Sequence, residues 1–168
     1  MENLSKQKNI NLPLIKSILI SNELHANLVI EILKNYENIN NVFTSGLTYK
    51  INSNVLRDSN FMKDIYTLLK MEKKVYCFDS DIRLSDPKVI DIKNKGALIF
   101  KKLNDFNANN LVDCFIINKI KDSELSDIIK LIRRNFRKEK KVLLIDLNSM
   151  LVKYFSNLDY DYIKLEVI

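Results

Sequence analysis

The sequence predicts a single three-layer α/β domain built on a mainly parallel central sheet. Short, β-branched and almost wholly apolar runs alternate with longer segments in which apolar residues recur every three or four positions. The short runs are typical of parallel strands buried on both faces, and the longer segments are typical of helices that cover those faces. The length of 168 residues suits one domain. We expect a flexible N-terminal lead over residues 1–13 and the α/β domain over residues 14–168.

The clearest unit is a strand, a helix and a strand over residues 112–118, 122–138 and 141–146. Asp122 or Ser123 is expected to cap the first turn of the helix. The two strands need a right-handed crossover, so this unit predicts how the helix lies on the sheet. Five apolar residues fall on one stripe of the helix, namely Leu125, Ile128, Ile129, Ile132 and Phe136.

The same two patterns predict the remaining elements along the chain. Residues 47–58 and 104–110 are polar and predict loops, and Asp86-Pro87 predicts a turn. The other predicted elements, in order, are a strand at 14–20, a helix at 21–36, a strand at 40–44, a helix from Ser59 or Asn60, strands at 74–78 and 97–101, a short helix at 149–155 and a strand at 162–167.

This order of elements resembles RecA-like or Rossmann-like α/β domains, but no Gly-rich phosphate loop accompanies it. Such a loop needs several glycines, so that backbone N–H groups can approach the phosphates, and a lysine for charge. The predicted first strand is followed by residues 21–24, which contain neither, and the whole chain has only Gly46 and Gly96. We therefore expect neither an active P-loop NTPase nor the usual mode of NAD or FAD binding.

Composition indicates an ordinary folded protein of the cell interior. Hydrophobic residues make up 46% of the chain and charged residues 29%. No apolar run approaches the ~18 residues that a membrane span requires, and the N-terminal stretch lacks the features of a signal peptide. We expect an intracellular protein, in the cytoplasm or the nucleus, without membrane contact.

Cysteine and histidine usage limits the catalytic and metal-binding sites that the chain can form. Cys77 and Cys114 each sit in the middle of an apolar predicted strand, which favours buried thiols in a reducing compartment. His25 is the only histidine, so any Ser-His-Asp or Cys-His catalysis would depend on it, and its position suits a cap or an exposed site. A zinc site built from Cys and His lacks ligands.

Carboxylates follow two of the predicted strands at their carboxyl ends, where parallel sheets bind ligands. Asp79, Asp81 and Asp146 are the candidates for holding Mg²⁺ or Mn²⁺, which prefer oxygen ligands. Tyr-Cys-Phe-Asp-Ser-Asp at 76–81 resembles the Asp-x-Asp motif of GT-A-type nucleotide-sugar glycosyltransferases, and 94–100 is similar to a later segment of those enzymes. The resemblance implies that the two acids hold the metal on a diphosphate. The alternative is that they bond the backbone of their own turn.

A basic cluster accounts for the net charge of +6. Lysine and arginine total 27 and aspartate and glutamate 21, and outside residues 130–141 the two signs balance. One hypothesis is binding of phosphates, on nucleic acid or an acidic partner, by backbone contact without base stacking. The other is a solvated helix end, which cations stabilise. The basic cluster consists of Lys130, Arg133, Arg134, Arg137, Lys138, Lys140 and Lys141.

Three functional hypotheses follow from these observations. The preferred one is a non-catalytic α/β subunit of a larger assembly, with protein partners in a hetero-complex, an association with nucleic acid, and no cofactor. The second is a small Mg- or Mn-dependent enzyme that acts on a nucleotide or phosphorylated substrate through Asp79 and Asp81, with Asp146 assisting. The third is a nucleic-acid backbone binder that uses the basic cluster.

Overall fold

The computed structural model describes residues 28–48, 52–53, 55–56, 60–107, 111–136, 142–155 and 162–164. The predicted lead at 1–13, the predicted strand at 14–20 and His25 lie outside the described residues. No helix in the described part of the chain is long and apolar enough to cross a membrane.

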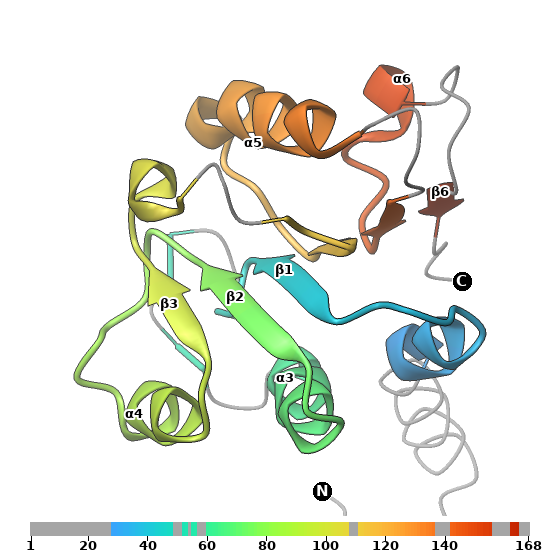
Figure 1. The fold of residues 1–168 in the computed structure, drawn as a ribbon. Helices are drawn as coiled ribbons and strands as arrows, with labels where there is room; N and C mark the ends of the chain where they lie inside the picture. Colours follow the sequence, from blue (N-terminus) through green and yellow to red (C-terminus); the bar gives the residue numbers. More distant parts are fainter. Residues whose placement is uncertain are drawn as a thin grey trace, which may run out of the picture.

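Six strands form one sheet in which every neighbouring pair is parallel (Figure 1). The strand order across the sheet is β3-β2-β1-β4-β5-β6. The predicted parallel sheet is therefore confirmed. The strands are β1 at Asn41–Ser45, β2 at Lys74–Phe78, β3 at Leu98–Phe100, β4 at Cys114–Ile117, β5 at Leu143–Asp146 and β6 at Tyr162–Lys164.

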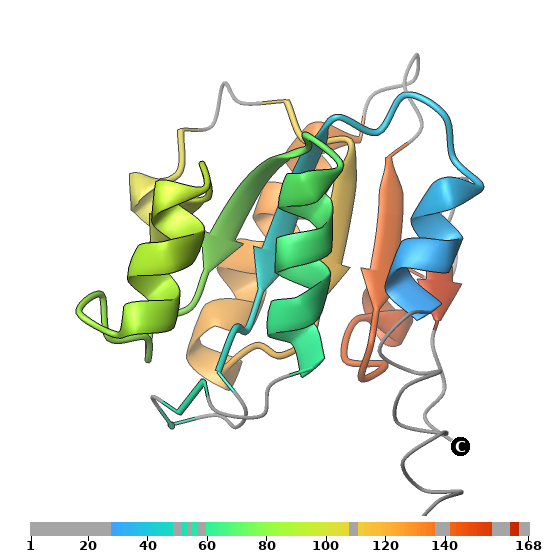
Figure 2. The ribbon, with the colours of Figure 1, turned by 90° about the horizontal axis from the view of Figure 1, so that it is seen from below.

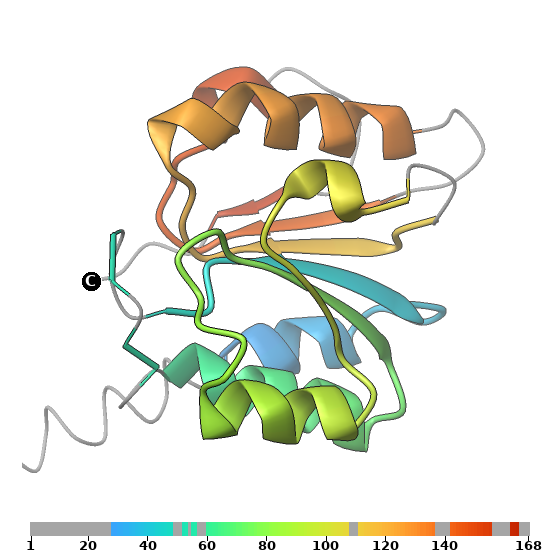
Figure 3. The same cartoon turned by 90° about the vertical axis from the view of Figure 1, so that its left-hand side faces the viewer.

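Helices cover both faces of the sheet, which confirms the three-layer architecture (Figures 2 and 3). The helical residues 28–34, together with α3 at Asn60–Lys70 and α4 at Pro87–Asn94, pack on one face. The opposite face carries the 3-10 turn η1 at Leu103–Asp105, α5 at Asp122–Asn135 and α6 at Val152–Phe155.

The strand order is that of Rossmann-type doubly wound sheets. From β1 the chain moves outward through β2 to β3, then returns to the other side of β1 and continues through β4, β5 and β6. The direction reverses between β1 and β4, so their carboxyl ends form the topological switch point, where such sheets bind ligands.

Successive strand residues point to opposite faces, and the two faces differ in chemistry. On the α3 face the strands present aliphatic and thiol side chains, such as Val42 and Cys77. On the α5 face they present aromatic rings, with Phe43 lying 5.3 Å from Phe106 and 5.5 Å from Phe115 between centroids. A slip of one residue would exchange the two sets, so the packing fixes the register of the sheet.

The two cysteines are buried and unbridged, as the sequence predicts. Burial raises the pKa of Cys77 to about 12, against a weaker lowering effect of a hydrogen bond with Thr44. Burial also raises the pKa of Cys114, and the nearby carboxylate of Asp113 adds to the shift. Neither side chain forms a thiolate at neutral pH, so both act as apolar core residues.

The turn predicted at Asp86-Pro87 is present, since the backbone N–H of Asp86 donates to the Arg83 carbonyl over 3.0 Å. The helix α4 that begins directly after Asp86 is not predicted from the sequence. The Asp86 side chain accepts a hydrogen bond of 2.8 Å from the backbone N–H of Lys88, and Pro87 occupies the first helical position. Proline is tolerated there because the first N–H groups of a helix have no intrahelical acceptor. The helix buries only Val89 and Ile92, which is too few to produce a visible periodicity in the sequence.

Helix α5 ends at Asn135, three residues before the predicted end at Lys138. The Asn135 side chain accepts a hydrogen bond of 3.0 Å from the backbone N–H of Val112 and donates one of 2.9 Å to the Leu131 carbonyl. Phe136 then has extended backbone angles, φ −73° and ψ 111°. A buried side chain that caps its own helix and bonds the segment leading into β4 thus sets the end of α5.

Candidate functional site

The loops after β1 and β4 meet at the switch point, and hydrogen bonds join them. The Ser45 hydroxyl donates to the Lys119 carbonyl over 2.7 Å, and the Asn118 side chain donates to the Gly46 carbonyl over 2.7 Å. The backbone N–H of Asn118 also donates to the Ser45 carbonyl over 3.0 Å. The crevice that a doubly wound sheet opens between these loops is therefore closed by the protein itself.

Gly46 permits this close approach. Its φ of +84° is in the left-handed region, which glycine adopts without steric penalty. A β-carbon at this position would lie 2.7 Å from the backbone nitrogen of Lys119 and against its Cγ. The space beside Gly46 is thus taken by the backbone and the aliphatic stem of Lys119.

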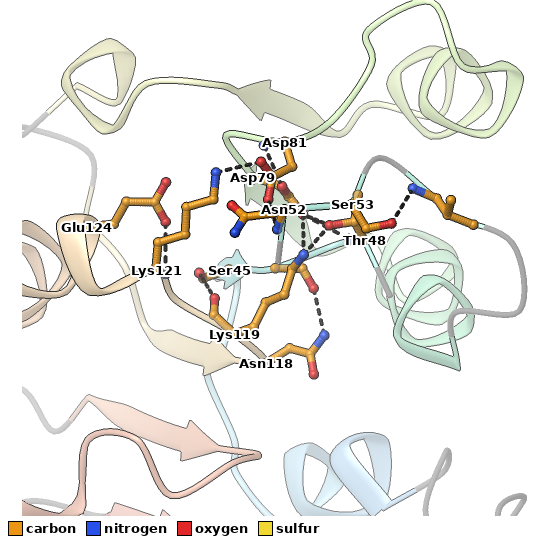
Figure 4. A network of polar contacts seen from close by, with 12 residues as sticks. Ser45, Thr48, Asn52, Ser53, Asp79, Asp81, Asn118, Lys119, Lys121 and Glu124 are labelled. Carbon is orange, nitrogen blue, oxygen red and sulfur yellow. Dashed lines mark hydrogen bonds and ion pairs between the residues drawn. The ribbon is translucent and has the colours of Figure 1, made fainter. Parts of the chain in front are cut away.

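The ammonium group of Lys119 lies in a polar cluster that follows the carboxyl ends of β1, β2 and β4 (Figure 4). It donates to the Thr48 hydroxyl and lies 3.7 Å from Oδ2 of Asp79. The side chains of Lys119 and Asp79 are only 12% and 3% exposed. Burial lowers the pKa of Lys119, while the carboxylates of Asp79 and Asp81 act in the opposite direction.

Asp79 accepts hydrogen bonds on both carboxylate oxygens. Oδ2 accepts from the backbone N–H of Thr48 over 2.8 Å and from its hydroxyl over 2.9 Å. Oδ1 accepts from the backbone N–H of Asp81 over 2.9 Å, which is the turn geometry typical of aspartate after a strand. Asp79 therefore connects the loop after β2 to the loop after β1.

Asp81 forms the second carboxylate–lysine pair of the cluster. It accepts from Lys121 over 2.5 Å and from the backbone N–H of Asn52 over 2.8 Å. Burial acts to raise the pKa of Asp81, but these hydrogen bonds and the charges of Lys121 and Lys119 outweigh burial and lower it. The hydrogen bond with Asp81 in turn raises the pKa of Lys121, the residue that precedes the first turn of α5.

The switch-point crevice leaves almost no free space. The pocket between Gly46, Asp79, Lys119 and Lys121 has a volume of about 10 Å³, which holds roughly one water molecule. Sites for small molecules and cofactors enclose roughly 300–1,000 Å³. A nucleotide can enter only if the lysine side chains move out.

Asp146 does not join Asp79 and Asp81. It is buried at the end of β5, where Oδ2 accepts from the backbone N–H of Leu151 over 2.7 Å. Strands β1 and β4 lie between β2 and β5, so at ~4.8 Å per strand Asp146 is roughly 14 Å away. Among the described residues no group of three or more His, Cys, Asp or Glu side chains could hold a metal ion.

The sequence alone does not identify Lys119 and Lys121 as residues of the site. They follow β4 within a few positions, but Asn-Lys-Ile-Lys matches no recognised motif. The only available signal is their place after a strand of the central sheet, and that place becomes informative only once β4 is known to neighbour β1.

The described members of the basic cluster lie along α5, away from the switch point. Lys130, Arg133 and Arg134 are all exposed. Lys130 bonds Asp127 over 3.1 Å, and the Arg133 guanidinium lies 5.8 Å from the centre of the Phe155 ring. The remaining four basic residues, Arg137, Lys138, Lys140 and Lys141, are outside the described part of the chain.

No protein-family model matches the sequence, and no curated protein matches it either. The contacts of the site itself are therefore the basis for assigning a function.

Proposed function

We propose that this chain is a non-catalytic α/β subunit of a larger assembly. Its switch-point cluster, which consists of Thr48, Asp79, Asp81, Lys119 and Lys121, acts as a structural lock: it holds the loops after β1, β2 and β4 together and binds no ligand. The observation that carries this proposal is the position of Lys119. Its backbone and stem occupy the space beside Gly46, where the phosphates of a nucleotide would approach the loop after β1.

The charges of the cluster also support a structural role over nucleotide binding. Two lysines face two carboxylates, with Lys119 at 3.7 Å from Asp79 and Lys121 at 2.5 Å from Asp81. Binding a diphosphate requires a surplus of positive charge and free N–H groups. Here the N–H groups of Thr48 and Asn52 already donate to the same two carboxylates.

The edge of the sheet offers a surface for a protein partner. β3 is an edge strand among the described residues, and its Leu98 is 43% exposed. Ile90 on the neighbouring α4 is also exposed. Exposed apolar side chains at an open strand edge favour association with another chain.

The competing hypothesis is an Mg- or Mn-dependent enzyme that uses Asp79 and Asp81. It requires Lys119 and Lys121 to leave both acids so that a metal and a nucleotide can replace them. Thermal melting of the full chain with Mg²⁺ or Mn²⁺, nucleotides and nucleotide-sugars separates the two hypotheses. A ligand at about 100 times its Kd adds roughly 2.7 kcal/mol, which shifts Tm by several degrees.

The structural lock predicts that no ligand in this panel shifts Tm and that Asp79→Asn alone lowers it. A shift that needs both metal and nucleotide, and that disappears in Asp79→Asn, would refute the proposal.

The assembly itself is tested in the source cells with a tagged chain. Leu98→Glu should release the chain from its complex in size-exclusion chromatography, whereas the exposed control Asn94→Glu should not. A wild-type chain that elutes as a monomer would also contradict the proposal.

A further inference from the structure

The connection between β3 and β4 is unusual in this sheet. The other described strand connections each contain an α-helix, whereas the described residues between β3 and β4 contain only η1. Figure 3 shows η1 in yellow beside α5, on the same side of the sheet. A groove of about 540 Å³ lies between η1 and α5, and an adjoining pocket of about 250 Å³ extends it.

Two segments far apart in the sequence form the walls of this groove. Residues 101–104 contribute Lys101, Lys102 and Asn104 to one wall. The α5 wall contains Lys130 and Arg134, which belong to the basic cluster. Two of the four basic residues of the groove, Lys101 and Lys102, therefore lie outside the basic cluster that the sequence predicts.

Four basic side chains line the groove and its adjoining pocket, against two acidic ones, Asp127 and Glu124. Lys130 is paired with Asp127 over 3.1 Å. Lys101, Lys102 and Arg134 are exposed and form no ion pair with any described residue. By contrast, the lysines of the switch-point cluster are each paired with a carboxylate. An excess of cations over acids on both walls of a groove favours a polyanion that runs between them.

We propose that this groove binds the phosphate backbone of single-stranded nucleic acid. The inference rests on the proposed function, because it names one partner of the assembly subunit. Proteins that bind single strands combine a positively charged groove with the flexible backbone that follows it, and the groove between η1 and α5 carries such charge on both walls. The amide of Asn104 supplies a neutral hydrogen-bonding group beside the cations.

The floor of the groove explains why bases are not read. Leu103 and Leu131 line it together with two buried rings, Phe106 and Phe78, which are 5% and 2% exposed. Phe106 packs edge-on against Tyr76 and Phe43. No ring among the described residues of the groove is open for base stacking, which contributes much of the affinity in many single-strand binders. Binding is therefore electrostatic and insensitive to sequence.

The salt dependence gives a quantitative expectation. Four phosphate contacts, from Lys101, Lys102, Lys130 and Arg134, predict a slope of about −3 for log K against log salt on single strands. Tripling the salt concentration should weaken binding about twentyfold. Removing two of the four cations should make the slope shallower by about 1.4.

The test is fluorescence anisotropy of a fluorescein-labelled 15-nucleotide oligo-dT with the full chain at 50 and 150 mM NaCl. K101A/K102A on one wall and R134A on the other should each weaken binding and flatten the salt slope. The matched control is K70A/K93A, which removes the same charge from exposed positions on α3 and α4, across the sheet. This control should bind like the wild type.

Three outcomes would overturn the inference. Equal losses in K70A/K93A and K101A/K102A would mean that net charge alone attracts the oligonucleotide. Equal affinity for a 15-base-pair duplex would exclude a single-strand groove. Displacement of the oligonucleotide by poly-L-glutamate at the same charge concentration would indicate a dock for acidic protein segments. None of these results depends on nucleotide binding at the switch point, so the proposed function is tested separately.

Discussion

The backbone nitrogen of Lys119 lies 2.7 Å from the point where a β-carbon on Gly46 would sit. The two loops that flank the switch point are therefore packed as closely as a bare backbone allows. This contact makes Gly46 a sensitive position at which to test whether the crevice is closed in solution.

Gly46→Ala should destabilise the fold by about 2–4 kcal/mol. The left-handed backbone alone accounts for ~1–2 kcal/mol, and displacement of Lys119 adds the rest. Gly96→Ala is the matched control, because Gly96 has a φ of +102° but no atom within 4 Å of the added β-carbon. Urea denaturation should show a smaller loss for Gly96→Ala. Equal losses would mean that Lys119 does not pack on Gly46 in solution.

Asp113→Ala should destabilise the fold by about 2–4 kcal/mol, because it would leave backbone donors at the start of β1 unsatisfied. Oδ2 of Asp113 accepts from the N–H groups of Asn40 and Asn41 over 2.9 and 2.8 Å, and from the Asn41 side chain over 3.1 Å. The exposed Asp105→Ala serves as the control in the same denaturation series. A loss below about 0.5 kcal/mol for Asp113→Ala would show that water replaces these bonds.

Asp64→Asn should stabilise the protein at pH 8 by about 2–4 kcal/mol and change little at pH 4. Asp64 on α3 is 4% exposed, and burial raises its pKa from 3.8 to about 7, with Lys63 acting weakly in the opposite direction. The folded state holds this proton more tightly than the unfolded chain, so its stability falls as pH rises from about 4 to 7. Above pH 7 the fold carries a buried charge.

Thermal melts of wild type and Asp64→Asn across this range measure the difference directly. The exposed Asp105→Asn should track the wild type at every pH. Equal Tm values for wild type and Asp64→Asn at pH 8 would show that the Asp64 carboxylate is solvated in the folded protein.

Lys121→Met should destabilise the protein by about 1 kcal/mol at pH 7 and by less at pH 2.5. The pKa of Asp81 is lowered in the fold, so its pairing with Lys121 stabilises the protein fully above the usual pKa of an aspartate. This stabilisation is lost as the pH falls through the lowered pKa of the folded state. Lys95→Met is the comparison, because the Lys95–Asp91 pair has a similar length of 2.5 Å but is exposed. Exposed pairs contribute little, so a larger effect at Lys95 would contradict the site geometry.

The strands and most helices could be predicted because each has a local pattern. The strand predicted at residues 74–78 is β2 as observed, and Phe61, Ile65 and Leu68 form the buried stripe of α3. Helix α4 could not be predicted, since two buried residues in eight give no period. Its only signals are the capping Asp86 and the following proline, which also occur in turns.

The site was predicted only in part, because strand order is not a local property. Asp79, Asp81 and Asp146 all follow strands, and the sequence alone places them at one edge of the sheet. Whether they meet depends on which strands are neighbours, and β1 and β4 separate Asp146 from the other two. The same missing information hid Lys119 and Lys121, which approach Asp79 and Asp81 because β4 lies beside β1.

The central position of β1 has a consequence for synthesis on the ribosome. One edge of β1 pairs with β2 soon after both are made, whereas the other edge waits for β4, with Asn41 and Asp113 separated by 72 positions. At bacterial or eukaryotic elongation rates this interval lasts roughly 4–14 s. During this interval the nascent chain exposes one unpaired edge of β1, the strand that contains Phe43. Such an edge is a template for mispairing with neighbouring chains. Arrival of β4 ends that vulnerable period and brings Lys119 onto Gly46.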